Sequence, residues 1–157
     1  MSGTHFELEQ EFEVEPSVLQ EFLCDLNNYV PLHPLIESIE ELSPNKDRPH
    51  ARRYRVLDRV PLGPFKLRVA YVAALESIAE NEVHGNAWQF PSIQLHTVYS
   101  LAATSAGTRL VENVTVHAPW LIRRYVIGQA RAAHAETLSK MKVLLESRRS
   151  VARPDHF

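Results

Sequence analysis

The feature that most constrains the fold is a long proline-free segment near the C-terminus. Residues 120–147 contain no proline and follow a long stretch whose pattern is that of β-strands. Apolar residues recur through the segment at three- and four-residue spacing, which predicts a long amphipathic helix. Its middle, residues 128–135, consists mainly of glycine and alanine, where a helix that only filled a core would carry leucine. We therefore expect empty space beneath the centre of this helix.

Most of the remaining chain is predicted to form strands. Between Phe6 and Val14 apolar and acidic residues alternate, which indicates a strand with one buried and one solvated face. Pro16 suits the first turn of a short helix that ends near Asn28, and the two prolines of residues 29–36 allow only a turn or a very short second helix. Further strands are predicted at residues 36–42, 51–60, 66–77, 81–90, 93–103 and 108–118.

This order of elements predicts an α+β fold of the helix-grip type. A curved seven-stranded antiparallel sheet would surround the long C-terminal helix, with two short helices after the first strand. Residues 1–147 are expected to form a single domain, and residues 148–157 a disordered tail.

Composition limits the partners and the cellular compartment that we expect for the chain. Its 157 residues carry 17 Lys and Arg against 19 Asp and Glu, so the net charge of -2 gives no reason to expect DNA as a partner. The single cysteine, Cys24, excludes an intrachain disulfide and favours a reducing compartment. No signal peptide or transmembrane segment is visible. We expect a cytoplasmic protein, with a weak homodimer left open as an alternative to a monomer.

Three stretches resemble a known superfamily. Residues 12–29, the sequence His33-Pro34-Leu35-Ile36 and the sequence Gly107-Thr108-Arg109-Leu110 are similar to the SRPBCC superfamily, which includes START, birch-pollen-allergen-like and polyketide cyclase/dehydrase proteins. The resemblance implies a deep apolar cavity for lipids, quinones, polyketides or hormones, and no fixed catalytic set. Leu32 stands where many relatives have tryptophan, so the resemblance assigns no subfamily.

The last predicted hairpin gives one specific candidate. If Ser105-Ala106 is a two-residue loop, Tyr99 pairs with Glu112 and the apolar residues of both strands share one face. Glu112 is then a carboxylate on the inward face, with a raised pKa and the capacity to act as general acid or base. It could equally be satisfied by Tyr99 or an arginine, or lie at a wet cavity mouth, and a one-residue slip would turn it outward.

The same parity argument gives the other candidates. His134 lies beside the small residues of the long helix and could exchange a proton with a ligand, although a half-exposed helix histidine is the more frequent explanation. Catalytic candidates are Glu112, His134 and Tyr99. The full set expected to line the cavity, or else a filled core, is Tyr54, Val56, Val69, Tyr71, Trp88, Phe90, Leu95, Tyr99, Glu112, Val114, Val126, Ala130, Ala133, His134 and Thr137.

Other chemistry has no support in the sequence. There is no glycine-rich phosphate loop, nucleophile elbow or zinc-protease motif, so no cofactor is expected. The histidines are scattered, and no metal site is expected. A basic stripe between Arg52 and Arg68 could bind RNA or acidic headgroups, but a solvated convex sheet face, balanced by the acidic first strand, is the more frequent explanation.

Three functions remain open at this point. We favour a binding or transport protein that encloses a small hydrophobic molecule between sheet and helix. The alternative is a polyketide aromatase/cyclase or dehydratase that uses Glu112, His134 or a tyrosine for proton transfer. The third is a non-catalytic, toxin-like module that interacts with RNA or protein through the basic stripe.

Overall fold

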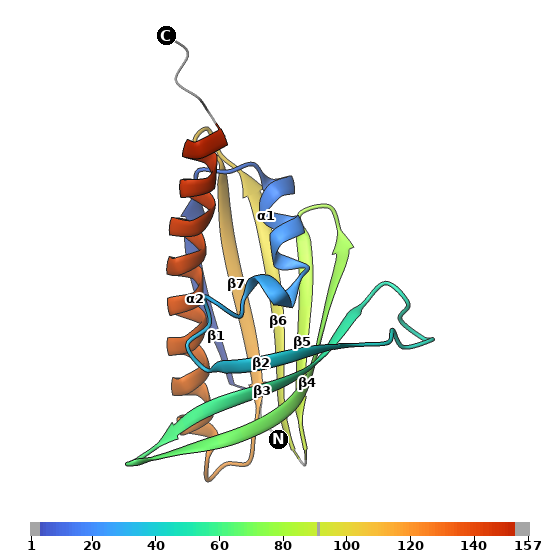
Figure 1. The fold of residues 1–157 in the computed structure, drawn as a ribbon, viewed down its shortest axis with the longest axis vertical. Helices are drawn as coiled ribbons and strands as arrows, with labels where there is room; N and C mark the ends of the chain where they lie inside the picture. Colours follow the sequence, from blue (N-terminus) through green and yellow to red (C-terminus); the bar gives the residue numbers. More distant parts are fainter. Residues whose placement is uncertain (1–3, 91, 153–157) are drawn as a thin grey trace.

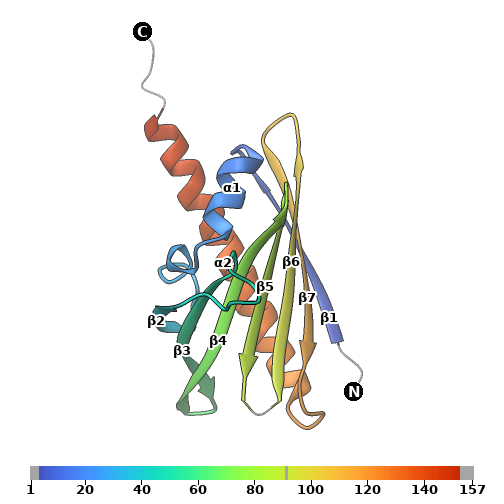
Figure 2. The same cartoon turned by 90° about the vertical axis from the view of Figure 1, so that its right-hand side faces the viewer.

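The described chain, residues 4–90 and 92–152 of a computed structural model, folds around one seven-stranded antiparallel sheet. The strands, in the spatial order β1-β7-β6-β5-β4-β3-β2, are β1 (Thr4–Phe12), β2 (Ile36–Leu42), β3 (Arg52–Leu62), β4 (Phe65–Ala79), β5 (Glu82–Gln89), β6 (Ile93–Ala103) and β7 (Thr108–His117). The helices are α1 (Pro16–Leu23), the short 3-10 helix η1 (Leu26–Asn28) and α2 (Arg123–Ala152). The sheet curves around α2 (Figures 1 and 2), which confirms the expected helix-grip fold.

The two short helices follow β1 as expected, but the second lies earlier in the chain. Helix α1 starts at Pro16, whose missing N–H costs nothing in a first turn. Asp25 then ends this helical stretch and starts η1, because its carboxylate accepts the backbone N–H of Asn27 at 3.0 Å. Residues 29–32 form turns rather than the second helix. The buried hydroxyl of Tyr29 donates to the Leu23 carbonyl at 2.7 Å and fixes this segment against α1.

The long helix is shifted toward the C-terminus relative to the prediction. It begins at Arg123 rather than Trp120, because residues 120–122 form a turn after Pro119. It also continues through residues 148–152, which were expected to belong to the tail. The guanidinium of Arg149 donates to the Glu13 carbonyl at 2.6 Å and attaches this part of the helix to the end of the first strand. Residues 153–157 of the expected tail lie outside the described residues.

The hairpin of β6 and β7 has the predicted register. Thr104 and Gly107 exchange backbone hydrogen bonds of 2.9 and 3.3 Å around the two-residue loop Ser105-Ala106. Tyr99 therefore pairs with Glu112. Gly107 is required where it stands, because a Cβ atom there would lie 2.2 Å from the Phe12 carbonyl oxygen and its φ is +155°.

Two groups of buried side chains pack α2 against the sheet. The larger group lies under α1 and the C-terminal part of α2, where Leu23 and Met141 are almost fully buried. The smaller group, around Phe6 and Val114, lies under the first part of the helix. Burial of each large apolar side chain stabilises the fold by about 1.5–3 kcal/mol, so the sheet is held at both ends of α2. Within the described chain no helix has the length and apolar character needed to cross a membrane.

Candidate functional site

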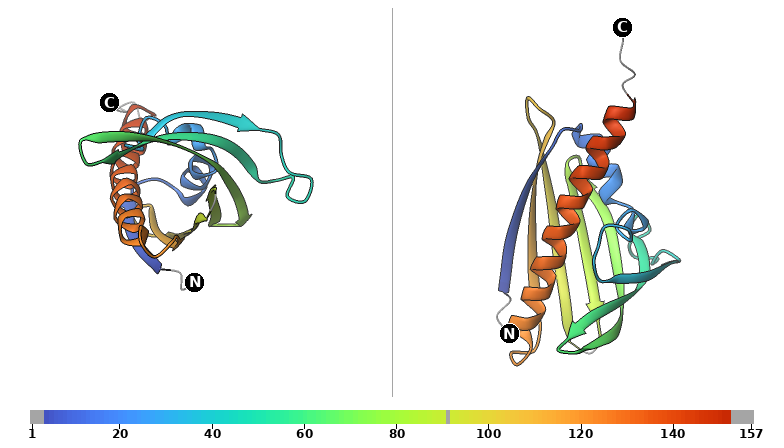
Figure 3. Two further views of the ribbon diagram at one scale, coloured as in Figure 1. Left: turned by 90° about the horizontal axis from the view of Figure 1, so that it is seen from below. Right: turned by 60° about the vertical axis from the view of Figure 1, so that its left-hand side comes forward.

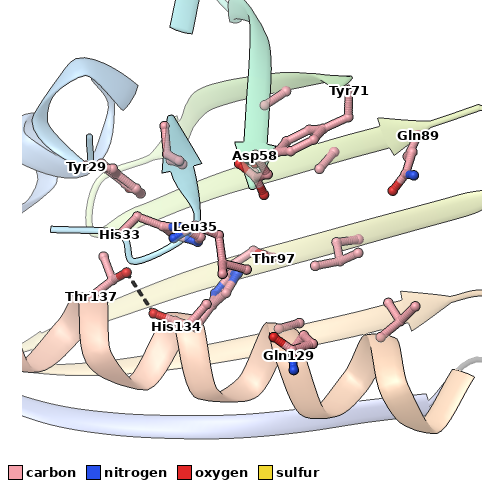
Figure 4. A pocket seen from close by; sticks show the side chains of 18 of the residues that line it. Tyr29, His33, Leu35, Asp58, Tyr71, Gln89, Thr97, Gln129, His134 and Thr137 are labelled. Carbon is pink, nitrogen blue, oxygen red and sulfur yellow. Dashed lines mark hydrogen bonds between the residues drawn. The ribbon is translucent and has the colours of Figure 1, made fainter. Parts of the chain in front are cut away.

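A cavity of about 420 Å³ lies between the concave face of the sheet and α2. Its walls come from β3 to β7, from the segment before β2 and from one face of the long helix (Figure 4). Ala130 and Ala133 form part of the helical wall, as the small-residue pattern predicted, whereas Gly128 faces open space outside the cavity. The size is within the range of about 300–1,000 Å³ that is typical of small-molecule sites.

Most of the predicted lining residues border this cavity. From the strands they are Val69, Tyr71, Leu95, Tyr99 and Glu112, and from α2 they are Val126, Ala130, Ala133, His134 and Thr137.

Three other predicted residues are buried but do not line the cavity. Tyr54 and Val56 pack in the larger core group, with the Tyr54 hydroxyl 3.4 Å from the Asp25 carboxylate. Val114 packs in the smaller group with Phe6. The inward face of the sheet serves both as core and as cavity wall, and strand parity alone does not separate the two.

The inward orientation predicted for Trp88 and Phe90 is wrong. The inward residues of β5 include Gly85, Ala87 and Gln89, while Trp88 borders a depression on the convex face together with Val72. Phe90 follows the strand and is 94% exposed. The prediction failed because β5 carries small and polar residues on its buried face, so that the largest side chain indicated the wrong side.

The centre of the cavity wall is a hydrogen-bonded pair of Glu112 and His134. The Glu112 side chain is only 1% exposed, and its carboxylate oxygen contacts Nδ1 of His134. His134 is mostly buried rather than half-exposed, which corrects the explanation favoured from the sequence. Burial by itself lowers the pKa of His134, but the charge of Glu112, the hydrogen bond to it and the charge of Asp58 together raise that pKa above its ordinary value.

This pair has the geometry of an oriented imidazole. Because Nδ1 is engaged by the carboxylate, Nε2 is the nitrogen left for a ligand, and Glu112 fixes the tautomer and the ring orientation. Across the β6–β7 pairing lies Tyr99. Its burial, followed by the charge of Glu112, raises its pKa well above the usual range, so the hydroxyl stays protonated.

The polar residues that line the cavity but were not among the predicted site residues include a histidine and an aspartate. His33, in the segment before β2, lies beside His134, with 6.2 Å between the ring centroids (Figure 4). Its Nδ1 accepts the backbone N–H of Leu35 at 3.2 Å, so neutral His33 carries its proton on Nε2. Burial and then the charge of His134 lower the pKa of His33 to about 3. His33 was visible in the His-Pro sequence of the resemblance, but nothing there indicated its orientation.

Asp58 is the second group. It shares strand parity with Val56 and Val60, so its inward direction could have been read from the sequence. The hydroxyl of Tyr71 donates to its carboxylate at 3.3 Å. Burial raises the pKa of Asp58 to about 6, although the Tyr71 hydrogen bond and the charge of His134 partly oppose the change. An acid held at this cost in stability is typical of a functional site.

A test of this carboxyl follows from its raised pKa. Its protonated form stabilises the fold fully below the ordinary aspartate pKa, and this contribution is lost as the pH rises through about 6. Asp58→Asn keeps a polar partner for Tyr71 without the charge. At about pH 8 we expect it to be more stable than the wild type by up to roughly 3 kcal/mol, with no gain at about pH 4. Urea unfolding at both pH values measures this, with the exposed Asp47→Asn as control. A gain that does not change with pH would contradict the assignment.

The basic stripe on the convex face is neutralised mainly by β2. Glu37 binds both Arg59 at 3.0 Å and Arg68 at 3.2 Å, and Glu40 binds Arg55 at 3.4 Å. The expectation that the acidic first strand supplies the counter-charges is wrong for these arginines. In the sheet order β2 is the neighbour of β3, whereas β1 lies at the opposite edge.

Comparisons with known proteins identify the class of the fold. No protein-family model matches the sequence, and no curated protein is significantly similar to it. Among solved structures, TTHA0849 from Thermus thermophilus is 20% identical, with a TM-score of 0.70 over 92% of this chain and 99% of that chain. A START superfamily protein from Mycobacterium smegmatis is 16% identical, with a TM-score of 0.69 over 92% and 99%. The Zhui aromatase/cyclase from a Streptomyces species is 15% identical, with a TM-score of 0.68 over 96% of each chain.

These similarities define the class of the fold. It is the START-like helix-grip fold, and the resemblance to the SRPBCC superfamily that the sequence indicated is confirmed at the level of fold. Sequence identities this low support a shared architecture only. The function therefore has to be argued from the cavity itself.

Proposed function

We propose that this protein binds a small, mainly apolar molecule that carries at least one polar oxygen, in the cavity between the sheet and α2. The observation that carries the proposal is the buried pair of Glu112 and His134 in the wall of an otherwise largely apolar cavity of about 420 Å³. Burying an ion pair costs several kcal/mol per ion before its mutual attraction is counted, and apolar residues of similar volume are often at least as stable. A protein that needed only a core has no use for this pair.

The polar groups define what such a ligand would need. Neutral His33 presents an N–H donor, and Nε2 of His134 accepts a hydrogen bond in the neutral form and donates one when protonated. Asp58 and Tyr71 form a second polar position on the β3 and β4 side. Lipids, quinones and polyketides all combine an apolar body with carbonyl or hydroxyl oxygens, and they remain the candidate classes.

Native mass spectrometry of the purified protein, followed by solvent extraction, tests the proposal. We expect a complex with one bound molecule, which extraction releases as an apolar compound with carbonyl or hydroxyl groups. The extracted protein should take the compound back in a one-to-one ratio. A protein that carries no molecule, and that binds none of a lipid, a quinone or a polyketide mimic afterwards, would contradict it.

A second candidate is an enzyme of the aromatase/cyclase or dehydratase kind, which the paired Glu112 and His134 specifically favour. A carboxylate that orients an imidazole beside a cavity is the arrangement used for general acid–base catalysis, which contributes about 10²–10⁴-fold to rates. If the released compound is a substrate, His134→Gln should reduce its conversion, followed by mass spectrometry, by about 100-fold or more while binding is largely kept. Equal losses of binding and conversion would leave His134 a binding residue only.

The cellular setting forms part of the same proposal. The single cysteine, Cys24, is a free thiol in a half-buried position beside α1. Burial raises its pKa, with an opposing contribution from Arg52, so this thiol is poorly suited to act as a nucleophile. We place the protein in the reducing environment of the cytoplasm.

A further inference from the structure

Large apolar side chains are exposed together at one end of the molecule. They belong to three connections: the β3–β4 hairpin, the β5–β6 turn and the β7–α2 turn. We call the group the apolar tip and define it as Leu62, Phe65, Phe90, Trp120 and Leu121, each at least half exposed. The views in Figures 1 and 2 agree that the three connections lie at the same end. Single exposed apolar residues are ordinary, but a group drawn from three separate loops indicates an interaction surface.

The segments that carry the apolar tip contain basic but no acidic residues. Residues 60–75, 83–111 and 113–135, which contain the three connections, include no aspartate or glutamate. Lys66 and Arg124 are exposed beside the tip. Arg123 donates to the Ala118 carbonyl at 3.1 and 3.2 Å. In the part of the chain that the structure describes, none of these three cations is paired with a carboxylate.

Several arginines on the sheet are neutralised by carboxylates. Arg55, Arg59 and Arg109 each have a glutamate partner on a neighbouring strand. Lys66, Arg123 and Arg124, which have no carboxylate partner among the described residues, therefore lie where the apolar side chains protrude, and the combination points to one kind of partner.

We propose that the apolar tip docks on an anionic lipid surface. Tryptophan beside basic residues is typical of segments that lie at a membrane interface, where the ring enters the headgroup region and the cations attract acidic lipids. Pairing with a second copy of this chain is disfavoured, because a two-fold contact would place the same unpaired cations against one another.

One end of the cavity lies at the apolar tip. Leu62, Ile122 and Tyr125 line the cavity and lie in or next to the same connections. Seen from this end (Figure 3, left), the β3–β4 hairpin lies beside the first turns of α2. A docked tip therefore presents this end of the cavity to the lipid. Docking itself does not require a bound ligand, so it is tested independently of the proposed function.

Co-sedimentation with vesicles tests the proposal. We expect binding to vesicles of phosphatidylcholine mixed with phosphatidylglycerol, weaker binding to phosphatidylcholine alone, and loss of binding as sodium chloride is added. The double variant Trp120→Ser and Leu121→Ser should weaken binding by roughly tenfold or more. Arg124→Glu should weaken binding to the mixed vesicles only. Val143→Ser, which changes an equally exposed apolar residue elsewhere on α2, should bind as the wild type does.

Fluorescence reports the insertion directly. In a Trp88→Phe variant Trp120 is the sole tryptophan, and its emission should shift to shorter wavelength when mixed vesicles are added. Unchanged emission, or equal binding by the wild type and the double variant at Trp120 and Leu121, would overturn the proposal. A dimer in sedimentation equilibrium that the same double variant dissolves would also overturn it, because the tip would then be covered by a second copy.

Discussion

Replacing Glu112 with alanine is expected to lower the free energy of unfolding by about 3–5 kcal/mol. The Glu112 side chain is 1% exposed and is bonded to His134, which loses its partner in the variant and keeps its burial. A buried polar ring without a partner is more costly than the intact pair. Urea unfolding near neutral pH measures the difference.

Two variants make this result specific to the buried pair. Glu136→Ala breaks an exposed ion pair of 3.0 Å between Glu136 and Lys140 on the same helix, and should cost less than about 1 kcal/mol. Replacing both Glu112 and His134 with leucine removes the pair entirely and should recover most of the lost stability. If the double variant is as unstable as Glu112→Ala, the pair is structurally required and the argument for its functional role fails.

The pKa of His134 provides a second measure of the pair. Because this pKa is raised in the folded protein, protonated His134 stabilises the fold. The contribution is complete below the ordinary histidine pKa and is lost as the pH rises through the pKa that His134 has in the folded protein. In Glu112→Gln burial dominates, so we expect the pKa of His134, followed by NMR, to fall below its ordinary value.

Replacing Ala130 with phenylalanine is expected to weaken ligand binding by about 100-fold or more. Ala130 lies in the helical wall, and a phenyl ring there occupies part of a cavity of about 420 Å³. The ring fills existing space, so the fold should be kept. Titration of the solvent-extracted protein with 1-anilinonaphthalene-8-sulfonate, a fluorescent apolar probe, measures binding, and far-ultraviolet circular dichroism checks the fold.

The matched control is Ala132→Phe, two residues further along α2. Ala132 is exposed to solvent, so the added ring lies outside the cavity and binding should equal that of the wild type. Equal binding by Ala130→Phe and Ala132→Phe would show that the probe binds elsewhere, for example on the apolar tip.

The sequence predicted the fold and the main polar residue of the site for identifiable reasons. Tyr99 and Glu112 were paired correctly because a two-residue loop leaves one register that places the apolar residues on a single face. The space beneath α2 followed from Ala130 and Ala133, since residue size is visible in the sequence. Local pattern was sufficient for both.

Other parts of the site depend on tertiary structure. Tyr54 and Val114 have the same inward parity as the lining residues, but other elements pack over them, and strand pattern carries no information about that packing. Whether His134 faces the cavity depends on the rotation of α2 about its own axis. The spacing of apolar residues along the helix defines this rotation only approximately. The contact between His33 and His134 joins a loop to a helix far along the chain, and no local signal predicts such a contact.

The central claim is that a small apolar molecule binds between the sheet and α2, beside Glu112 and His134. Nuclear Overhauser effects from bound 1-anilinonaphthalene-8-sulfonate to the protein test it most directly, because they report which side chains touch the probe. We predict contacts with the methyl groups of Ala130, Ala133 and Leu95, which line the cavity. Contacts confined to Trp120, Leu121 or other exposed residues would contradict the claim.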